Sequence, residues 1–268
     1  MAAAHPRLVA GAVLIDAGIS CRETEKRLAR LGLSASNLRA IFVSHEHSDH
    51  ITGIPTLSKK FNLPVYITSS TLQHSNIPVQ AHLVRGFVAD KPVQVGNITV
   101  RPFAKSHDAV DPHSFMVSAG QLNVGVFTDI GYCCGEVKKH FSQCHAAFLE
   151  ANYCEEMLEK GSYPWHLKRR ISGEKGHLSN NQALELFVQF RGPQLSHLLL
   201  SHLSKNNNTP ERVQELFDPS AGATRVVIAS RYRETEVFCI DGNVPVPAPG
   251  PIATRRPKPS INQLSLFD

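Results

Sequence analysis

The chain has 268 residues, of which 42% are hydrophobic and 19% are charged, and its formal net charge is +5. This is the composition of a globular protein large enough for one α/β domain or two small ones. The net charge is compatible with an anionic partner but too small to indicate one. No apolar run approaches the roughly 18–20 residues that span a bilayer, and the start lacks the layout of a signal peptide. We therefore expect a cytoplasmic protein without a membrane partner, with its six cysteines reduced.

The first part of the chain alternates apolar runs with helical patterns. Residues 11–19 are expected to form a buried strand that ends at Asp16. Ser20 is a suitable helix N-cap, and Glu23 completes a capping box for a helix that stops at Gly32. The elements expected next are a buried strand at 39–44, a helix at 51–61 and a strand at 64–68.

From residue 93 onward the pattern changes. Alternating apolar residues with Gly-Asn and Ala-Gly-Gln turns predict antiparallel hairpins over 93–128. The elements expected after them are a helix at 135–142, a strand at 146–152, a helix at 178–190, a strand at 195–203, a helix at 209–217 and a strand at 225–230. Strands that alternate with helices predict an α/β fold.

The end of the chain differs from the rest. Residues 243–262 are rich in proline and basic side chains and carry no core pattern, which predicts an extended linker. A short apolar tail follows at 263–268. The sequence therefore predicts a catalytic domain over 1–242, a linker and a tail.

One motif carries most of the chemistry. Residues 44–50 read Ser-His-Glu-His-Ser-Asp-His. His45 and His47 alternate on an extended segment, so both imidazoles can point the same way, while Asp49 and His50 follow in a turn. Scattered surface histidines are the simplest alternative, but four nitrogen and oxygen ligands within six residues favour a site for zinc, manganese or iron.

Three further candidate ligands stand at the predicted tips of strands. His107, Asp129 and His202 each end an apolar run, where α/β proteins usually place their sites. Any one of them alone is compatible with a buried, hydrogen-bonded polar residue. Together with the first motif they predict a centre with two metals.

This order of ligands resembles the metallo-β-lactamase superfamily. The resemblance implies a four-layer αββα sandwich with two divalent metal ions. It assigns His45, His47 and His107 to one metal, Asp49, His50 and His202 to the second, and Asp129 to both. It also gives Asp16 the role of bracing the histidine loop. Two such ions acidify bound water, and we expect Asp49 to carry the proton.

Superfamily membership leaves the substrate open among lactams, thioesters, lactones and phosphodiesters. Gly-His-Leu-Ser-Asn at 176–180 places His177 at a predicted helix start, which favours a phosphate site. Further candidates for contact with a nucleic-acid backbone are Ser179, Asn180, Ser204, Lys205, Asn207, Lys168, Arg169, Arg170 and Lys175. A solvated helix face is the alternative explanation of the basic run at 165–175.

Several blocks together resemble the YycJ/WalJ branch of the superfamily. They are Ser-His-Asp-Ala-Val-Asp-Pro at 106–112, Thr-Asp-Ile-Gly at 128–131, Leu-Glu-Ala-Asn at 149–152, the 176–180 block and Ser-His-Leu-Ser-Lys-Asn-Asn-Asn at 201–208. The resemblance implies a DNA exonuclease acting from 5′ ends, with His177 on the phosphate. Glu150 and Asn152 lie in a family-like block but receive no role.

The chain departs from the branch at two places. One is its short N-terminus, which places an edge strand and part of the substrate groove in doubt. The other is His113, where a small apolar residue is expected.

The tail residues Gln263, Leu264, Ser265, Leu266 and Phe267 resemble the pentapeptide that binds the bacterial sliding clamp. The apolar side chains can enter a pocket, and the glutamine can fix the register. The alternative is a disordered end with accidental apolar residues. A clamp partner implies a nuclease in replication or mismatch repair, associated with the nucleoid when it is clamp-bound.

Three other functions remain open. An RNA-processing phosphodiesterase of the same superfamily would cleave RNA, and a small-molecule hydrolase, such as a lactamase or thioesterase, would not need the 176–180 block or the tail. A non-catalytic, clamp-bound DNA adaptor is favoured if the altered N-terminus disables the groove. The intact set of metal ligands argues against the adaptor.

Overall fold

A computed structural model describes residues 11–242. The expected linker at 243–262 and the tail at 263–268 lie outside the described residues, as does the start of the chain through residue 10. Within the described range, no helix is long and apolar enough to cross a membrane.

The first sheet has four parallel strands in the order β1-β2-β3-β4. Its strands are β1 (Ala12–Ile15), β2 (Leu38–Phe42), β3 (Val65–Tyr66) and β4 (Val84–Arg85). The helices that cover its outer face are α1 (Cys21–Arg30), α3 (Ile54–Phe61) and α4 (Ser69–Ser75). Ile54 and Leu57 of α3 and Leu72 of α4 pack in one apolar core with strand residues Ile41 and Val65. Apolar runs such as 39–44 are therefore buried on both faces, as parallel sheets require.

The second sheet has seven strands in the order β11-β10-β9-β8-β7-β6-β5. They are β5 (Val93–Val95), β6 (Ile98–Ala104), β7 (His113–Ala119), β8 (Leu122–Phe127), β9 (Ala146–Glu150), β10 (His197–Ser201) and β11 (Arg225–Ile228). Strands β5 to β8 are antiparallel, which confirms the predicted hairpins, whereas β8 to β11 are parallel.

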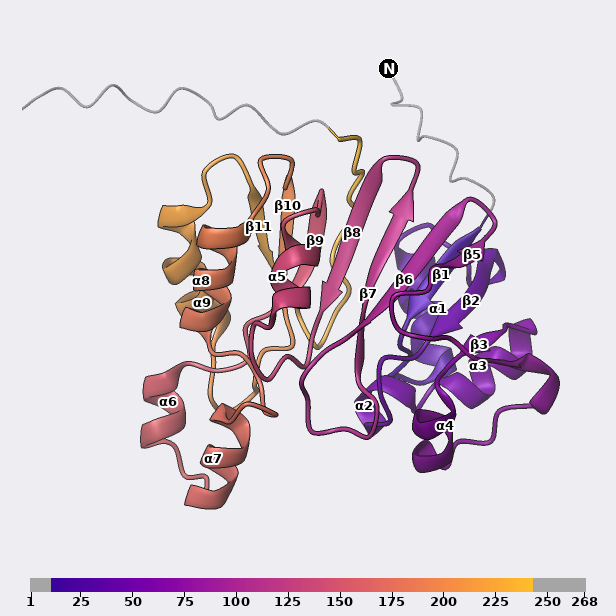
Figure 1. The fold of residues 1–268 in the computed structure, drawn as a ribbon, viewed down its shortest axis with the longest axis horizontal. Helices are drawn as coiled ribbons and strands as arrows, with labels where there is room; N and C mark the ends of the chain where they lie inside the picture. The colour runs from indigo at the N-terminus through magenta and orange to yellow at the C-terminus, as the bar shows by residue number, and fades with distance from the viewer. Residues whose placement is uncertain (1–10, 243–268) are drawn as a thin grey trace, which may run out of the picture.

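Three helices cover the outer face of the second sheet (Figure 1). They are α5 (Gly135–Phe141), α8 (Asn180–Phe190) and α9 (Pro210–Phe217). Each contributes a fully buried phenylalanine to the largest core, namely Phe141, Phe187 and Phe217. Thr209 caps α9 and Pro210 occupies its first turn, which agrees with the helix expected at 209–217.

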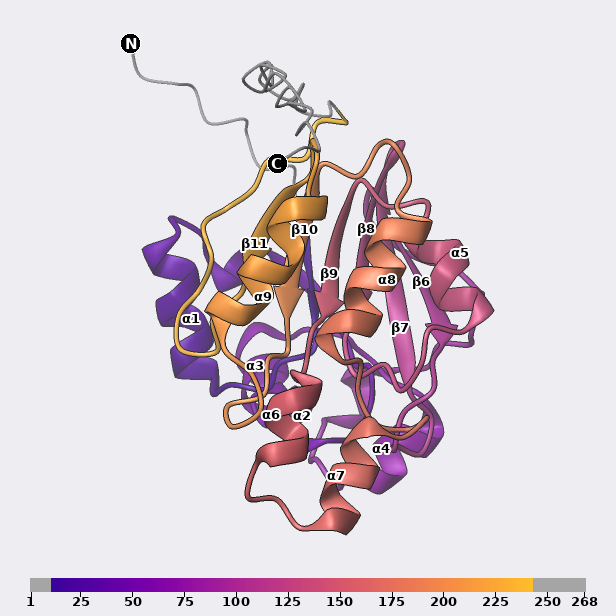
Figure 2. The same cartoon turned by 90° about the vertical axis from the view of Figure 1, so that its left-hand side faces the viewer.

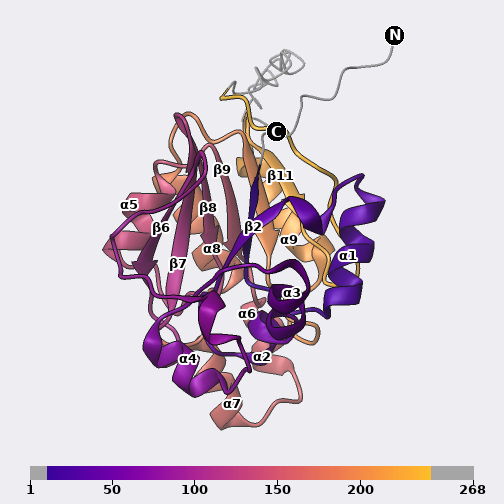
Figure 3. The same cartoon turned by 90° about the vertical axis from the view of Figure 1, so that its right-hand side faces the viewer.

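A third core lies between the two sheets. It joins Ala40 and Phe42 of β2 to Val100 of β6 and Phe115 of β7. The layers are therefore helix, sheet, sheet and helix, which confirms the predicted αββα class (Figures 2 and 3).

Some element boundaries differ from the prediction. Strand β6 ends at Ala104, three residues before His107, so that histidine lies in a loop rather than on a strand. Ser20 caps α1, as expected. The carboxylate of Glu23, however, accepts a hydrogen bond from Arg27 and not from the backbone N–H of Ser20, so the capping box is incomplete. The full capping box belongs instead to α8, between Ser179 and Gln182.

Short helices follow the strands at one end of the sandwich, the lower end in Figure 1. They are α2 (Ser48–Ile51), α6 (Glu155–Lys160) and α7 (Trp165–Ser172). The loop that precedes α2 carries the histidine motif, and α7 lies just before His177 in the chain. The candidate ligands of both sheets therefore gather at this end.

Candidate metal centre

The histidine loop after β2 is held by Asp16, which follows β1. One carboxylate oxygen of Asp16 accepts from the backbone N–H of Ser44 at 2.7 Å. The other accepts from the Ser44 hydroxyl at 2.7 Å and from Nδ1 of His50 at 2.8 Å. Because Nδ1 is used in this way, Nε2 of His50 is left for the centre of the cluster.

Close backbone contact fixes the same loop against β1. The N–H of Ala17 donates to the carbonyl of His50 at 2.7 Å. A Cβ atom on Gly18 would lie 1.5 Å from the carbonyl oxygen of Asp49, so a side chain cannot be accommodated there. The glycine after the first strand therefore allows α2 to approach.

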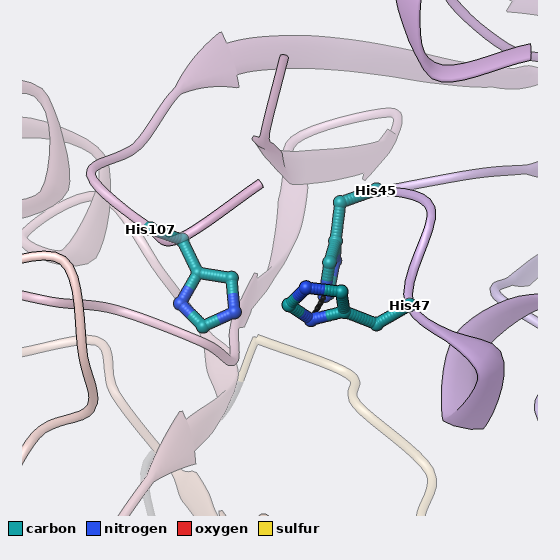
Figure 4. Close-up of side chains that lie close together, drawn as sticks. All are labelled: His45, His47 and His107. Carbon is teal, nitrogen blue, oxygen red and sulfur yellow. Dashed lines mark hydrogen bonds between the residues drawn. The ribbon is translucent and has the colours of Figure 1, made fainter. Parts of the chain in front are cut away.

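Three imidazoles converge from two loops. Figure 4 shows His45 and His47 from the loop after β2 facing His107 from the loop after β6. Their ligand atoms lie within 4.8 Å of one another, and Nε2 of His45 is 3.0 Å from Nδ1 of His47. His107 donates from Nδ1 to the carbonyl of Gly176 at 3.0 Å, and its buried Nε2 has no hydrogen-bond partner.

A second group of ligand atoms lies beside the first. Asp49, His50 and His202 each offer an atom within 4.8 Å of the others. Nε2 of His50 and Nε2 of His202 are both 3.7 Å from the same oxygen of Asp49.

Asp129 lies between the two groups. One of its oxygens is 3.3 Å from Nε2 of His202 and 3.7 Å from Nε2 of His107, and the other is 3.3 Å from Nε2 of His50. The carboxylate is only 2% exposed, and its second oxygen has no hydrogen-bond partner. A buried carboxylate oxygen without a partner is rare, and a metal ion satisfies it.

Three residues at this site adopt a backbone conformation that is uncommon for residues other than glycine. The φ angle is 55° at Asp129, 59° at His202 and 57° at Asp16. Each directly follows or nearly follows a strand, and each turns its side chain into the cluster. Such conformations cost on the order of 1–3 kcal/mol and collect at functional sites.

The charge state of the cluster suits cation binding. Burial lowers the pKa of His45 and lowers that of His107 to about 4, so both imidazoles are neutral near pH 7. The neighbouring His202 imidazole lowers the pKa of Asp49 to about 2, so this side chain is a carboxylate. Against the effect of burial, the carboxylate of Asp16 raises the pKa of His50 and that of Asp129 raises the pKa of His202, so a bound metal would displace a proton from these two imidazoles. Imidazoles and carboxylates without sulfur suit zinc, manganese or iron, so these residues fit divalent metal ions.

Glu150, at the end of β9, organises the second sheet's part of the centre. It is fully buried, and one oxygen accepts from Nδ1 of His177 at 2.7 Å and from Nδ1 of His202 at 2.9 Å. The other oxygen accepts from the N–H groups of Ile130 and Leu178. Burial raises the pKa of this carboxyl, but the two imidazoles outweigh it and lower the pKa to about 2.

The sequence alone gave Glu150 no role, because a single acidic residue at the end of a strand cannot be distinguished by its sequence context from other acidic residues. The available signal was an acid within an otherwise apolar strand, where a charge must be paired. The sequence gave no role to Asn152 either. Its amide donates to the carbonyl of His202 at 2.8 Å and so supports the left-handed backbone conformation of His202. Lys105 is the third residue at the centre to which the sequence gave no role. It is buried, and its Nζ donates to the carbonyl of Thr128 at 2.7 Å.

A pocket of about 250 Å³ opens onto the cluster. It is lined by His47, Asp49, His107, Asp108, Asp129, Leu167, Arg170, Ile171, Lys175, Gly176, His177 and His202. Of the basic run, Arg170 and Lys175 therefore reach the site. Lys168 instead donates to the carbonyl of Glu159, and neither it nor Arg169 lines the pocket.

Four of the expected phosphate contacts have structural roles instead. Ser179 and Asn180 are buried: Ser179 caps α8, and Asn180 donates to Asn208. Asn207 is buried as well, and its N–H donates to the hydroxyl of Ser204. None of the four lines the pocket. The start of α8 is also closed by its capping box and is not an open anion site.

His113 occupies the start of β7, where a small apolar residue was expected. It is buried, its Nδ1 donates to the carbonyl of Asp111, and its ring meets Phe87 edge-on. Its backbone N–H donates to the carbonyl of Ser44 at 2.9 Å. The residue thus joins the second sheet to the histidine loop without entering the pocket.

Comparison with known proteins agrees with this arrangement. Residues 12–202 match the family described as the beta-lactamase superfamily domain. The chain is 34% identical over 204 residues to a protein of Bacillus anthracis named exodeoxyribonuclease YycJ, with 74% of this chain and 76% of that protein covered. It is 33% identical, with the same coverage, to exodeoxyribonuclease WalJ of Streptococcus pneumoniae.

Solved structures show the same fold. The protein YhfI of Bacillus subtilis, described as a metallo-β-lactamase fold protein, superposes with a TM-score of 0.63 at 18% identity, covering 84% of this chain and 86% of that one. Zinc-bound PqqB of Methylobacterium extorquens gives 0.65 at 13% identity, covering 86% and 84%.

Proposed function

The chain belongs to the beta-lactamase superfamily and is a hydrolase of that fold, and on this premise we propose that it is a metal-dependent DNA exonuclease. The observation that carries the proposal is the pocket, in which Arg170, Lys175 and His177 lie beside the metal-ligand cluster. The positive side chains of Arg170 and Lys175 beside a metal centre suit a phosphodiester better than a lactam or a thioester. The names of the YycJ and WalJ relatives support DNA as the substrate.

We assign the metals as follows. His45, His47 and His107 would hold one ion, Asp49, His50 and His202 would hold the other, and Asp129 would be a ligand of both. When bound, two divalent ions acidify a water and stabilise negative charge on the phosphate. Zinc or manganese is the expected metal, and iron also suits the donor set.

The remaining pocket residues bind and orient the substrate. Asp49 faces the pocket as an ionised carboxylate and is placed to take up a proton. Glu150 accepts from Nδ1 of His177 and so orients the ring, and Nε2 would donate to a phosphate oxygen when both ring nitrogens are protonated. Arg170 is held over the pocket by Asp108, with Nε 2.5 Å from the carboxylate. The names of the YycJ and WalJ relatives favour an exonuclease, which we propose acts from 5′ ends.

The substrate is tested with labelled nucleic acids. The protein is incubated with manganese or zinc and with single- and double-stranded DNA and RNA that carry a label at the 5′ or the 3′ end. We expect DNA to be degraded, with early release of the 5′ label, and a His45→Ala variant to be inactive. Loss of RNA alone would identify an RNA-processing enzyme, and no cleavage of DNA with any metal would overturn the proposal. Equal cleavage by His45→Ala would reveal a contaminant.

We further propose that the tail, which lies outside the described residues, tethers the enzyme to the sliding clamp in replication or mismatch repair. Leu264, Leu266 and Phe267 are the apolar anchors, and Gln263 and Ser265 complete the pentapeptide. We expect the pair Leu266→Ala and Phe267→Ala to abolish binding to the purified clamp while hydrolysis of free DNA ends is unchanged. Unchanged clamp affinity would refute the tether and leave the nuclease proposal intact.

A further inference from the structure

A second group of ligand-type side chains lies on the outer face of the second sheet. It consists of Asp90, in the segment before β5, and Glu136 and His140 of α5. One ligand atom from each lies within 4.8 Å of the others. The three share no residue with the centre described above or with its pocket.

His140 is the unusual member. It is only 4% exposed, and neither of its ring nitrogens has a hydrogen-bond partner. Its ring is stacked on Phe103 with centroids 4.1 Å apart, which holds the plane of the imidazole. Burial lowers the pKa of this imidazole, so it is neutral at pH 7 and has a lone pair to offer. A buried polar group without a partner requires an explanation, and a bound cation supplies one.

The two acids are placed to complete a site. Glu136 is one helical turn before His140, so both side chains share a face of α5, and its carboxylate is 3.5 Å from Nε2 of His140. Asp90 is fixed from β6: its N–H donates to the carbonyl of Pro102, and its carbonyl accepts from Arg101. Asp90 also has φ of 62°, a conformation that the chain maintains without a glycine.

One neighbouring cation competes for the same carboxylate. Lys139 donates to Glu136 at 3.0 Å, but its side chain is 56% exposed. An exposed ion pair of this kind contributes little free energy, so the lysine can move aside. Arg101 uses its guanidinium on the backbone of Asp90 and not on its carboxylate.

We propose that Asp90, Glu136 and His140 form a binding site for a divalent cation of the zinc type, separate from the hydrolytic centre. One imidazole and two carboxylates are a donor set that zinc accepts, with water in the remaining position. The ion would join α5 to the segment before β5. Its role is therefore structural or regulatory.

The test measures zinc per chain by equilibrium dialysis of the full-length protein at a buffered free zinc concentration. The double variant Asp90→Asn/Glu136→Gln should bind about one equivalent less than the wild type, because both carboxylate ligands are lost. The control is Glu159→Gln/Glu211→Gln, which changes two exposed acids outside the cluster and should bind as much as the wild type. Equal zinc in both double variants would overturn the proposal.

A second measurement separates this site from the hydrolytic centre. In a His45→Ala/Asp129→Asn background, about one equivalent should remain, and adding Asp90→Asn/Glu136→Gln should remove it. The side-chain nitrogen resonances of His140 should shift during zinc titration in that background. Resonances of His140 that do not move would contradict the site, whatever the outcome for DNA hydrolysis.

Discussion

The two sheets contribute to the centre in different ways. The first sheet supplies His45, His47, Asp49 and His50 from a single loop, within six residues. The second supplies its candidate ligands from three separate connections, after β6, β8 and β10. The first contribution is a local motif, whereas the second exists only after the strands have paired. A centre of this kind therefore forms only when both sheets are folded and packed.

Each half has its own orienting carboxylate, which is partly buried in the first half and fully buried in the second. Asp16 holds Ser44 and His50 in the first half, and Glu150 holds His177 and His202 in the second. Asp16 serves one candidate ligand directly, whereas Glu150 serves a candidate ligand and the proposed phosphate contact together. We infer that the second half depends more strongly on its carboxylate than the first.

Replacing the residue between the halves should have the largest effect. Asp129→Asn removes the carboxylate that lies near His50, His107 and His202. We expect kcat for DNA hydrolysis to fall by at least about 1000-fold, equivalent to about 4 kcal/mol of activation free energy. Steady-state kinetics with manganese check this. A fall of less than tenfold would mean that the halves do not share a metal bridge.

The two orienting carboxylates should differ in effect. We expect Glu150→Gln to lower metal affinity or kcat by about 100-fold and Asp16→Asn by about 10-fold, the range typical of residues that orient metal ligands. The reason is that Glu150 accepts from two imidazoles and two backbone N–H groups. Metal titration and kcat of the two variants, measured side by side, decide the order. A larger loss for Asp16→Asn would reverse our ranking of the halves.

An effect no larger than that of Asp16→Asn is expected at the pocket wall contributed by the second half. Arg170→Ala should raise KM for DNA by about tenfold, or about 1.4 kcal/mol, with kcat nearly unchanged, because the side chain is proposed to bind the phosphate and not the reacting atoms. Arg169→Ala is the matched control, since this neighbour does not line the pocket. Equal changes in KM for both variants would show that only general positive charge matters.

The same contrast explains what the sequence could predict. The histidine motif and the strand-tip positions of Asp129 and His202 follow from local spacing and apolar runs, and the αββα class followed from the resemblance that they carry. The roles of Glu150 and Asn152 depend on which strands are neighbours, and β9 lies between β8 and β10 only in the folded sheet. The burial of Ser179 and Asn207 could not be predicted from the sequence either. In a sequence, a polar side chain that caps a helix or holds a loop cannot be distinguished from one that binds a ligand.

The central claim is that one metal centre, shared by both sheets, hydrolyses DNA. The most direct measurement is cleavage of 5′-labelled single-stranded DNA by the full-length protein. Cleavage is measured before chelation of the metal, after chelation, and after manganese or zinc is added back. The Asp129→Asn variant is measured in parallel. We predict that chelation abolishes cleavage, that metal restores it in the wild type and that it does not restore it in the variant. Cleavage that survives chelation, or full recovery of Asp129→Asn, would contradict the account.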